Sequence, residues 1–225
     1  MAKTAILVDG GFYRKRAARL WGKKTAEERA KELNAYCMAH LNDPHRQEDR
    51  QLYRIFYYDC EPVGRRSVYH PLTKKNVDLD KSETHTWMLT FLDELRRRRK
   101  FALRLGTLST QSYYNLRPEV TRKLLAGTRT LEDLTEDDFL FVSQQKGVDM
   151  RIGIDIASLA YKKQADQIIL IAGDSDFVPA AKLARREGID FILDPMWAEI
   201  KPDLFEHIDG LKSQWRKKEE PNETD

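Results

Sequence analysis

The sequence predicts an α/β fold in which a central, mainly parallel sheet is flanked by helices in three layers. Short, continuous apolar runs recur along the chain, as in strands that are buried on both faces. Segments with helical periodicity separate these runs. Strands that alternate with helices are joined by crossover connections, and such connections produce a parallel sheet.

The composition agrees with one decorated domain. The chain has 225 residues, of which 41% are hydrophobic, which suffices for a packed core and argues against disorder. Its 39 basic and 36 acidic side chains give a formal net charge of +3, which indicates a nucleic-acid partner only weakly. No apolar run is long enough for a membrane span or a signal peptide. Cys37 and Cys60 fit no metal or redox spacing, so we expect a reduced, cytoplasmic protein.

The first half of the chain begins with a continuous apolar run at residues 4–9, which predicts a buried strand that ends at Asp9. A helical region is expected from residue 12 to 40, with a break near Gly22 because glycine weakens a helix interior. The remaining expected elements are a strand at 52–58, a helix at 82–99 and a strand at 101–108.

The second half has the clearer pattern. Apolar residues at i, i+4, i+7 and i+8 predict a helix over 149–163. We then expect a strand at 167–172, a helix that ends at Gly188 and a strand at 189–193.

Two polar segments interrupt this alternation and are interpreted as insertions, at about 61–82 and 109–145, the second carrying one short helix. We expect residues 1–211 to form a single domain and residues 212–225 to form a flexible tail.

Acidic residues stand where the expected strands end and helices begin. Asp9 ends the first strand, Asp174 and Asp176 follow the strand at 167–172, and Asp149 opens the preceding helix. If the first strand neighbours the strand at 167–172, these carboxylates meet at the sheet edge where α/β proteins bind ligands. Crowded carboxylates repel one another unless a cation lies between them, and Mg²⁺ or Mn²⁺ suits oxygen ligands. Such an ion can polarise a phosphodiester and help to ionise a water molecule.

Each acid also has a structural interpretation. Asp9 could form a turn before two glycines, while Asp149 and either Asp174 or Asp176 could be helix N-caps. Asp155 lies at the margin of the apolar stripe of its helix, where it would either support a metal site or form a surface salt bridge.

Four motifs resemble the NYN domain family, in its LabA-like branch, within the PIN-like superfamily of metal-dependent nucleases. They are Val8–Tyr13, Phe56–Asp59, Lys146–Asp149 and Ala172–Phe177. The resemblance implies a parallel sheet with an acidic pocket at its carboxyl edge and RNA as the substrate.

The resemblance also implies roles for individual residues. The metal-binding and catalytic acids of the family carry over onto Asp9, Asp149, Asp174 and Asp176, and Asp155 matches a recurrent acid of the same helix. Many relatives have Asn at the position of Phe12, so this chain lacks a polar contact there.

We therefore expect a ribonuclease that hydrolyses RNA phosphodiester bonds with one or two Mg²⁺ or Mn²⁺ ions. Asp155 and Ser175 would support the metal ligands. Side chains expected to contact RNA are the cations Arg14, Arg16 and Lys146, with Tyr13, Tyr57 and Tyr58 stacking on bases, although at least one of the last two is expected in the core.

Other functions stay open at this point. The chain could be a regulatory module that binds RNA or a protein while its acidic pocket is idle, with a protein partner or a second copy held through the insertions. A haloacid-dehalogenase-like phosphatase is disfavoured because Gly11 stands where that chemistry needs a second Asp. A nucleotide-binding Rossmann protein is disfavoured because no G-x-G-x-x-G follows a strand.

Overall fold

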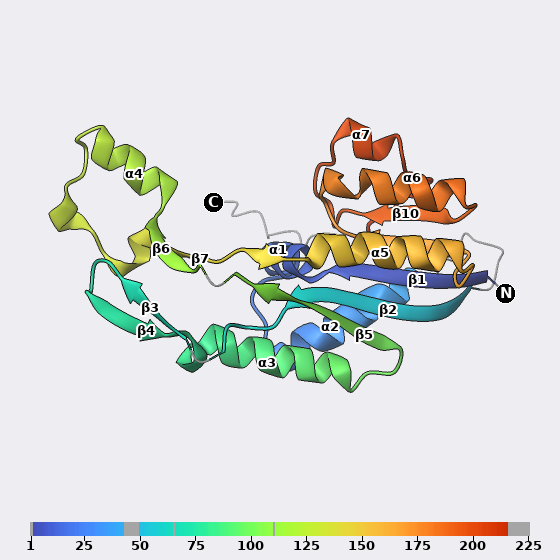
Figure 1. Ribbon diagram of the computed structural model, residues 1–225, viewed down its shortest axis with the longest axis horizontal. Coiled ribbons are helices and arrows are strands. Elements are labelled where there is room, and N and C mark those ends of the chain that lie inside the picture. Colours follow the sequence, from blue (N-terminus) through green and yellow to red (C-terminus); the bar gives the residue numbers. More distant parts are fainter. Residues whose placement is uncertain (1, 43–49, 65, 110, 216–225) are drawn as a thin grey trace, which may run out of the picture. The chain divides into compact units, whose positions relative to one another are not determined.

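The computed structural model describes residues 2–42, 50–64, 66–109 and 111–215 (Figure 1). The chain divides into two compact units, which are described separately. The first comprises residues 1–59, 90–106 and 147–225, and the second comprises residues 60–89 and 107–146.

A seven-stranded sheet has the strand order β11-β10-β9-β1-β2-β5-β8. β1 lies between β2 and β9 and pairs in parallel with both. β10 likewise pairs in parallel with β9 and β11. The edge strand β8 pairs antiparallel with β5. The bounds are β1 (Ala2–Asp9), β2 (Arg50–Cys60), β5 (Phe101–Leu108), β8 (Gln145–Lys146), β9 (Gln167–Ile171), β10 (Asp190–Asp194) and β11 (Gly210–Leu211). The mainly parallel α/β sheet is confirmed.

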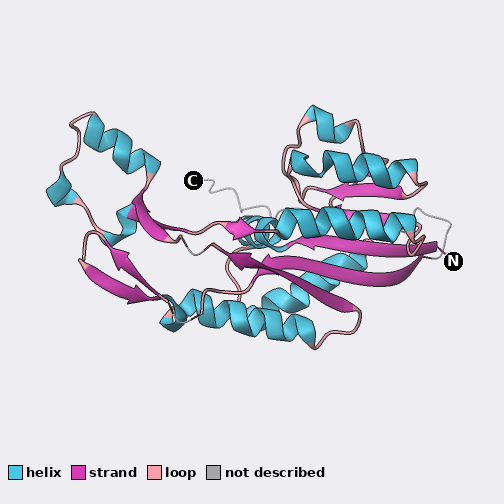
Figure 2. Ribbon diagram, in the orientation of Figure 1, coloured by secondary structure: helices cyan, strands magenta, loops and turns pink. Residues whose placement is uncertain are grey.

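Helices lie on both sides of the central strands (Figure 2), which gives the three layers that the sequence predicts. The bounds are α1 (Gly10–Trp21), α2 (Ala26–Ala39), α3 (Glu83–Arg96), α5 (Val148–Tyr161), α6 (Val178–Arg186), α7 (Pro202–Phe205) and the short 3₁₀ helix η4 (Ser175–Phe177). None of the helices in the described part of the chain has the length and apolarity that a bilayer span requires.

Local signals set the helix ends. The predicted break is confirmed at Gly22, which has a φ of 78° and is followed by Thr25, the N-cap of α2. Thr25 and Glu28 form a capping box, in which each side chain accepts a hydrogen bond from the other residue's backbone N–H. Gly188 ends the α6 region with a φ of 83°, as predicted.

The core lies between the sheet and its helices. The residues of β1 from Ala5 to Val8 are fully buried, and every residue of β9 is buried. These strands are covered on both faces, and this explains why the sequence shows continuous apolar runs rather than alternation.

The C-terminal part differs from the expectation of a tail from residue 212. The backbone N–H of Lys212 donates to the carbonyl of Leu193 over 2.9 Å, and the Trp215 ring packs on Trp21 and Tyr36 at centroid distances of 5.6 and 5.3 Å. Residues 212–215 are therefore part of the folded unit, because aromatic packing and the edge of β10 hold them. The rest of the expected tail, 216–225, lies outside the described residues.

The second unit contains the segments interpreted as insertions. It has two two-stranded antiparallel sheets, β3-β4 and β6-β7, that the sequence did not suggest. The aromatic rings of Tyr114 and Phe139 pack on His70 at centroid distances of 4.5 and 5.0 Å. The elements are β3 (Ser67–His70), β4 (Lys75–Asp78), β6 (Tyr113–Leu116), β7 (Phe139–Val142), α4 (Pro118–Leu125), and the 3₁₀ helices η1 (Leu79–Lys81), η2 (Leu131–Asp133) and η3 (Glu136–Asp138). α4 corresponds to the expected short helix.

Candidate metal centre

The strand order brings the predicted acids to one sheet edge. β1 and β9 are parallel neighbours, with Val8 opposite Ile171. Asp9 is the next residue of β1, and the chain leaves β9 toward Asp174 at the same end. The predicted cluster required β1 to neighbour the strand at 167–172, and the structure shows this pairing.

Asp9 combines a structural role with an unfavourable charge. Its carboxylate accepts a hydrogen bond from the backbone N–H of Phe12 over 3.0 Å and thereby caps α1. The pKa of Asp9 is raised to about 6, mainly by burial and further by the charges of Asp149 and Asp59. The hydrogen bond from the Phe12 backbone N–H acts in the opposite direction. The cap thus compensates only part of the cost of burying this carboxylate.

Asp149 is not the N-cap of its helix. Gly147 occupies that position with a left-handed φ of 78°, and Asp149 lies in the first turn of α5. Partial burial raises the pKa of Asp149, and the charges of Asp174 and Asp176 raise it further. Each of these three contributions disfavours the ionised carboxylate.

The turn after β9 carries the other two acids, both exposed. Asp174 accepts a hydrogen bond from the backbone N–H of Asp176 over 3.2 Å and caps the short 3₁₀ helix η4. The N-cap of α6 itself is Phe177, so neither acid caps that helix as the sequence suggested. Ser175 accepts a hydrogen bond from the Lys201 ammonium over 3.1 Å. The Asp176 carboxylate is not needed for this cap.

These acids fit a hard, hydrated cation. Asp9, Asp149, Asp174 and Asp176 supply carboxylate oxygens, and the pKa of Asp149 is raised by burial and further by the charges of Asp174 and Asp176. A divalent ion that keeps several of its water ligands would relieve this repulsion without tight chelation.

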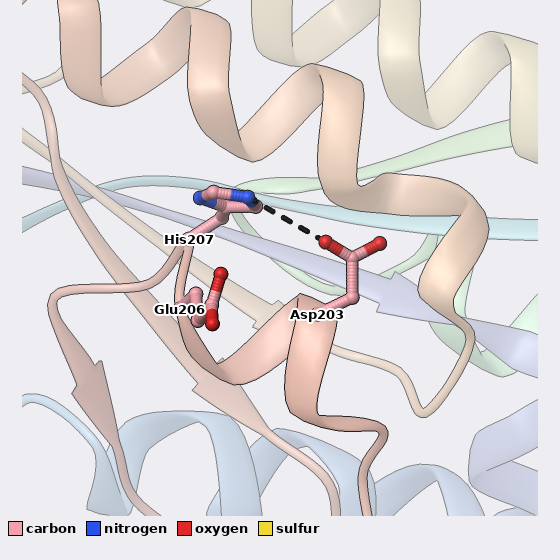
Figure 3. A group of neighbouring side chains, drawn as sticks. All are labelled: Asp203, Glu206 and His207. Carbon is pink, nitrogen blue, oxygen red and sulfur yellow. Dashed lines mark ion pairs between the residues drawn. The ribbon is translucent and has the colours of Figure 1, made fainter.

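A tighter group of potential ligands lies elsewhere. In the described residues, the group of three whose ligand atoms all lie within 4.8 Å of one another is Asp203, Glu206 and His207 (Figure 3), so the four predicted acids are more widely spaced. His207 Nε2 is 3.6 Å from Asp203 Oδ1 in an ion pair at the end of the four-residue helix α7, and both acids are exposed. We interpret this group as a surface ion pair.

Phe12 covers part of the predicted site. A Cβ atom added to Gly173 would lie 2.5 Å from Cε2 of the Phe12 ring, so the ring rests directly on the turn that precedes Asp174. An apolar ring therefore stands where the resemblance suggests an Asn. Only glycine allows the turn to approach the ring so closely.

Arg14 is engaged inside the protein. Its Nε and one terminal nitrogen donate to the two carboxylate oxygens of Asp59, each over 3.0 Å, and the Tyr57 hydroxyl donates to the same carboxylate over 2.8 Å. Asp59 is buried and influences the pKa of Asp9. We did not assign Asp59 a role from the sequence, although it lies near the end of its strand just as Asp9 does.

Two further residues predicted to contact RNA have internal partners. Tyr13 is fully buried, its hydroxyl donates to Glu32 over 3.0 Å, and its ring therefore has no face free for a nucleobase. Arg16 donates from Nε to the carbonyl of Met196 over 3.1 Å. Lys146 is exposed and lies in β8, in the second unit.

Asp155 forms a partly exposed salt bridge with Arg104. Its carboxylate accepts hydrogen bonds from Arg104 Nε over 3.0 Å and from the Tyr58 hydroxyl over 2.8 Å. Tyr57 and Tyr58 are both fully buried, so both belong to the core. Of the two interpretations of Asp155, the structure shows the salt bridge.

A comparison with protein families supports the fold and the motifs. Residues 90–200 match the NYN domain. The matched segment includes Asp149, Asp174 and Asp176, whereas Asp9 lies before it. Searches of curated proteins and of solved structures found no match.

Proposed function

We propose that this chain is a metal-dependent ribonuclease that hydrolyses RNA phosphodiester bonds. One observation carries the proposal: burial raises the pKa of both Asp9 and Asp149, and neighbouring carboxylates at the carboxyl edge of the sheet raise them further, Asp149 acting on Asp9 and both Asp174 and Asp176 acting on Asp149. The NYN domain match over residues 90–200 supports this assignment, because it points to a PIN-like nuclease family.

In this proposal Asp9, Asp149, Asp174 and Asp176 hold one or two Mg²⁺ or Mn²⁺ ions. A bound ion would supply Lewis-acid polarisation of the phosphodiester and a more acidic water. Asp9 must lose its proton to act as a ligand, and its pKa of about 6 makes ion binding by this residue release protons near that pH. Lys201 and Ser175 stabilise the turn that carries Asp174 and Asp176, and Lys146 is exposed for contact with the RNA backbone.

The test is an assay on end-labelled single-stranded and hairpin RNA with Mn²⁺, Mg²⁺ or EDTA. We expect metal-dependent products from the wild type and a loss of at least about 100-fold with Asp174→Asn, since removal of one stabilising group costs this much in other enzymes. His207→Ala is the matched control, because it removes a ligand-type side chain from the other group, and it should retain full turnover. Undiminished cleavage by Asp174→Asn would remove this residue from the mechanism.

A second function is favoured by the Phe12 ring on Gly173. An idle pocket would bind a metal ion and RNA without cutting the RNA. Intact RNA that is retained in a binding assay, together with metal binding that Asp174→Asn abolishes, would establish this regulatory function instead.

The domain organisation belongs to the same proposal. We infer that the domain predicted over residues 1–211 is one NYN domain, that it also includes residues 212–215, and that the second unit is inserted into it in two segments. Limited proteolysis tests this idea, since cleavage within the second unit should leave the first unit folded. Assignment to the LabA-like branch and a cytoplasmic location stay predictions from the sequence.

A further inference from the structure

The turn after β10 holds two residues in a left-handed backbone conformation. Met196 and Trp197 have φ values of 47° and 61°, although neither is a glycine. A residue with a Cβ atom adopts this conformation at a cost in free energy, and it persists where the surrounding structure enforces it. Strain of this kind clusters at binding and catalytic sites.

Three side chains hold this turn. The backbone N–H of Met196 donates to the Asp194 carboxylate over 2.7 Å. The backbone N–H of Trp197 donates to the Ser213 hydroxyl over 3.0 Å. Arg16 donates from Nε to the carbonyl of Met196 over 3.1 Å. The strained turn is therefore fixed by the protein itself.

The indole ring of Trp197 is held in one orientation and is half exposed. Trp197 is 51% exposed, and its Nε1–H donates to the carbonyls of Gln214 and Trp215 over 3.0 and 2.8 Å. The N–H group is thus occupied inside the protein, and the ring offers its apolar surface to solvent. Such a ring suits stacking by a flat ligand, because little conformational freedom is lost on binding.

Helix α1 supplies cations beside this turn. The helix contains no acidic residue, and Arg16 and Arg19 share one of its sides because they are three residues apart. Arg19 is exposed, and the carbonyl that Arg16 contacts does not neutralise the charge of Arg16. Burial lowers the pKa of Arg16, and the charge of Arg19 lowers it further. An anion bound here would relieve this repulsion.

The segment after Trp197 does not cancel this positive charge. It carries one exposed acid, Glu199, and one exposed cation, Lys201, before α7 begins. These two charges balance each other. The two arginines of α1 therefore make the surface around the turn attractive to an anion.

The turn lies at the same edge of the sheet as the candidate metal centre. β9 and β10 are parallel neighbours, so the residues after both strands stand at the carboxyl edge. Arg16 is about 9 Å along the axis of α1 from Gly10, at the helix end that Asp9 caps. Lys201, four residues after Trp197, donates to Ser175, which separates Asp174 from Asp176.

We propose that the Trp197 ring stacks on a nucleobase of single-stranded RNA and that Arg16 and Arg19 bind the neighbouring phosphates. An aromatic surface beside cations matches the alternation of bases and phosphates in a nucleic-acid strand. Single strands expose the faces of their bases, whereas a duplex hides them, so this surface selects single-stranded RNA. The inference rests on the proposed action of the chain on RNA and names where the substrate is held.

Fluorescence anisotropy with a labelled single-stranded RNA in EDTA measures binding without metal-dependent cleavage. Trp197→Ala should weaken binding by about 5- to 150-fold, the range expected for the loss of one stacked base. Trp197→Phe keeps an aromatic face and should retain most of the affinity, which separates stacking from loss of the indole hydrogen bonds. Tyr161→Ala is the matched control, because it removes a 63% exposed ring at the other end of α5, and it should bind as the wild type does.

The salt dependence of binding tests the cations. Arg19→Gln should reduce the slope of log affinity against log salt concentration by about 0.7, the value for one phosphate contact on a single strand. Lys163→Gln removes an exposed cation just after α5 and should leave the slope unchanged.

Three results would overturn the proposal: wild-type affinity in Trp197→Ala, equal losses in Trp197→Ala and Trp197→Phe, or a wild type that binds no single-stranded RNA. The nuclease proposal fails in a different way. RNA that is bound through Trp197 but stays intact with Mn²⁺ would support the stacking site and contradict the nuclease. Metal-dependent cleavage with wild-type RNA affinity in Trp197→Ala would do the reverse.

Discussion

Asp9 and Asp194 occupy similar places but have different surroundings. Each ends a parallel strand beside β9, and Asp194 is level with Ile171 just as Val8 is. Asp194 is fully buried and lies within hydrogen-bonding distance of four groups: the Tyr36 hydroxyl at 2.6 Å, His40 Nε2 at 2.8 Å, the Met196 backbone N–H at 2.7 Å and the Ser213 hydroxyl at 2.9 Å.

The comparison shows that position at a strand end does not by itself make an acid functional. Hydrogen-bond donors surround the carboxylate of Asp194. Through them Asp194 links Tyr36 and His40, at the end of α2, to Ser213 in the C-terminal segment. Backbone hydrogen bonds from Phe12 and Gly11 favour the charged form of Asp9, whereas burial and the charges of Asp149 and Asp59 disfavour it. A carboxylate that the fold leaves uncompensated is the one that suits an ion from solution.

The largest expected effect is the loss of stability on substitution of Asp194, the acid whose carboxylate is fully hydrogen-bonded. Asp194→Ala should lower the free energy of unfolding by about 4 kcal/mol, because it leaves buried donors without an acceptor. Urea unfolding measures this change. Asp176→Ala removes an exposed carboxylate and should change the metal-free stability by less than about 0.5 kcal/mol. Equal losses of stability in Asp194→Ala and Asp176→Ala would contradict the idea that the fold depends on Asp194 and not on the acids of the candidate site.

The second largest expected effect is the stabilisation of the protein by a metal ion bound to the acids of the candidate site. Mn²⁺ or Mg²⁺ at about 100 times its dissociation constant should stabilise the wild type by about 2.7 kcal/mol, and a chelator should reverse the effect. Asp174→Asn should lose most of this gain, whereas His207→Ala should keep it. Thermal unfolding with and without the ion provides the measurement. If the stabilisation by the ion were lost in His207→Ala instead, the ion would bind at the group of Asp203, Glu206 and His207.

The pH dependence of metal-free stability tests Asp9 directly. Folded Asp9 keeps its proton to about pH 6, whereas the unfolded residue loses it near its ordinary pKa of 3.8. The folded state therefore binds more protons in this window, and its stability should fall as the pH rises from about 4 to 6. Asp9→Asn retains an N-cap side chain, should remove this dependence, and should stabilise the metal-free protein at pH 7.5 by about 2 kcal/mol. A variant as pH-dependent as the wild type would contradict the assignment.

The smallest expected effect concerns Phe12. Phe12→Asn removes the ring from Gly173 and should cost about 1 kcal/mol of stability, while it adds a polar group beside the acids. We expect a several-fold rise in metal-dependent cleavage, measured in the RNA assay. Phe12→Leu keeps the site apolar and should not raise turnover, which separates polarity from the loss of the ring.

The sequence predicts those parts of the fold that depend on local patterns. Continuous apolar runs located the central strands, and Gly22 and Gly188 located helix ends. The acids of the candidate site were found because they follow strands. The partners of Asp59 and Asp155 were not found, because Arg14 and Arg104 lie 45 and 51 residues away in the chain and no local pattern links them.

Short-range signals also failed in two other regions. The two small antiparallel sheets of the second unit have strands of four residues and few buried positions, so their periodicity is weak. The C-terminal residues are polar apart from Trp215, and their order depends on contacts with Trp21 and Tyr36. Both features are set by tertiary contacts that an isolated segment does not show.

The position of β1 in the sheet has a consequence for synthesis on the ribosome. β1 is a central strand, and it is synthesised well before one of its two neighbours, β9, which begins only at residue 167. Until then one edge of β1 has no native partner, and Asp9 stands apart from Asp174 and Asp176. The nascent chain therefore carries an open apolar strand edge until β9 has been made, and the candidate acidic centre can assemble only after the turn that carries Asp174 and Asp176 has been synthesised.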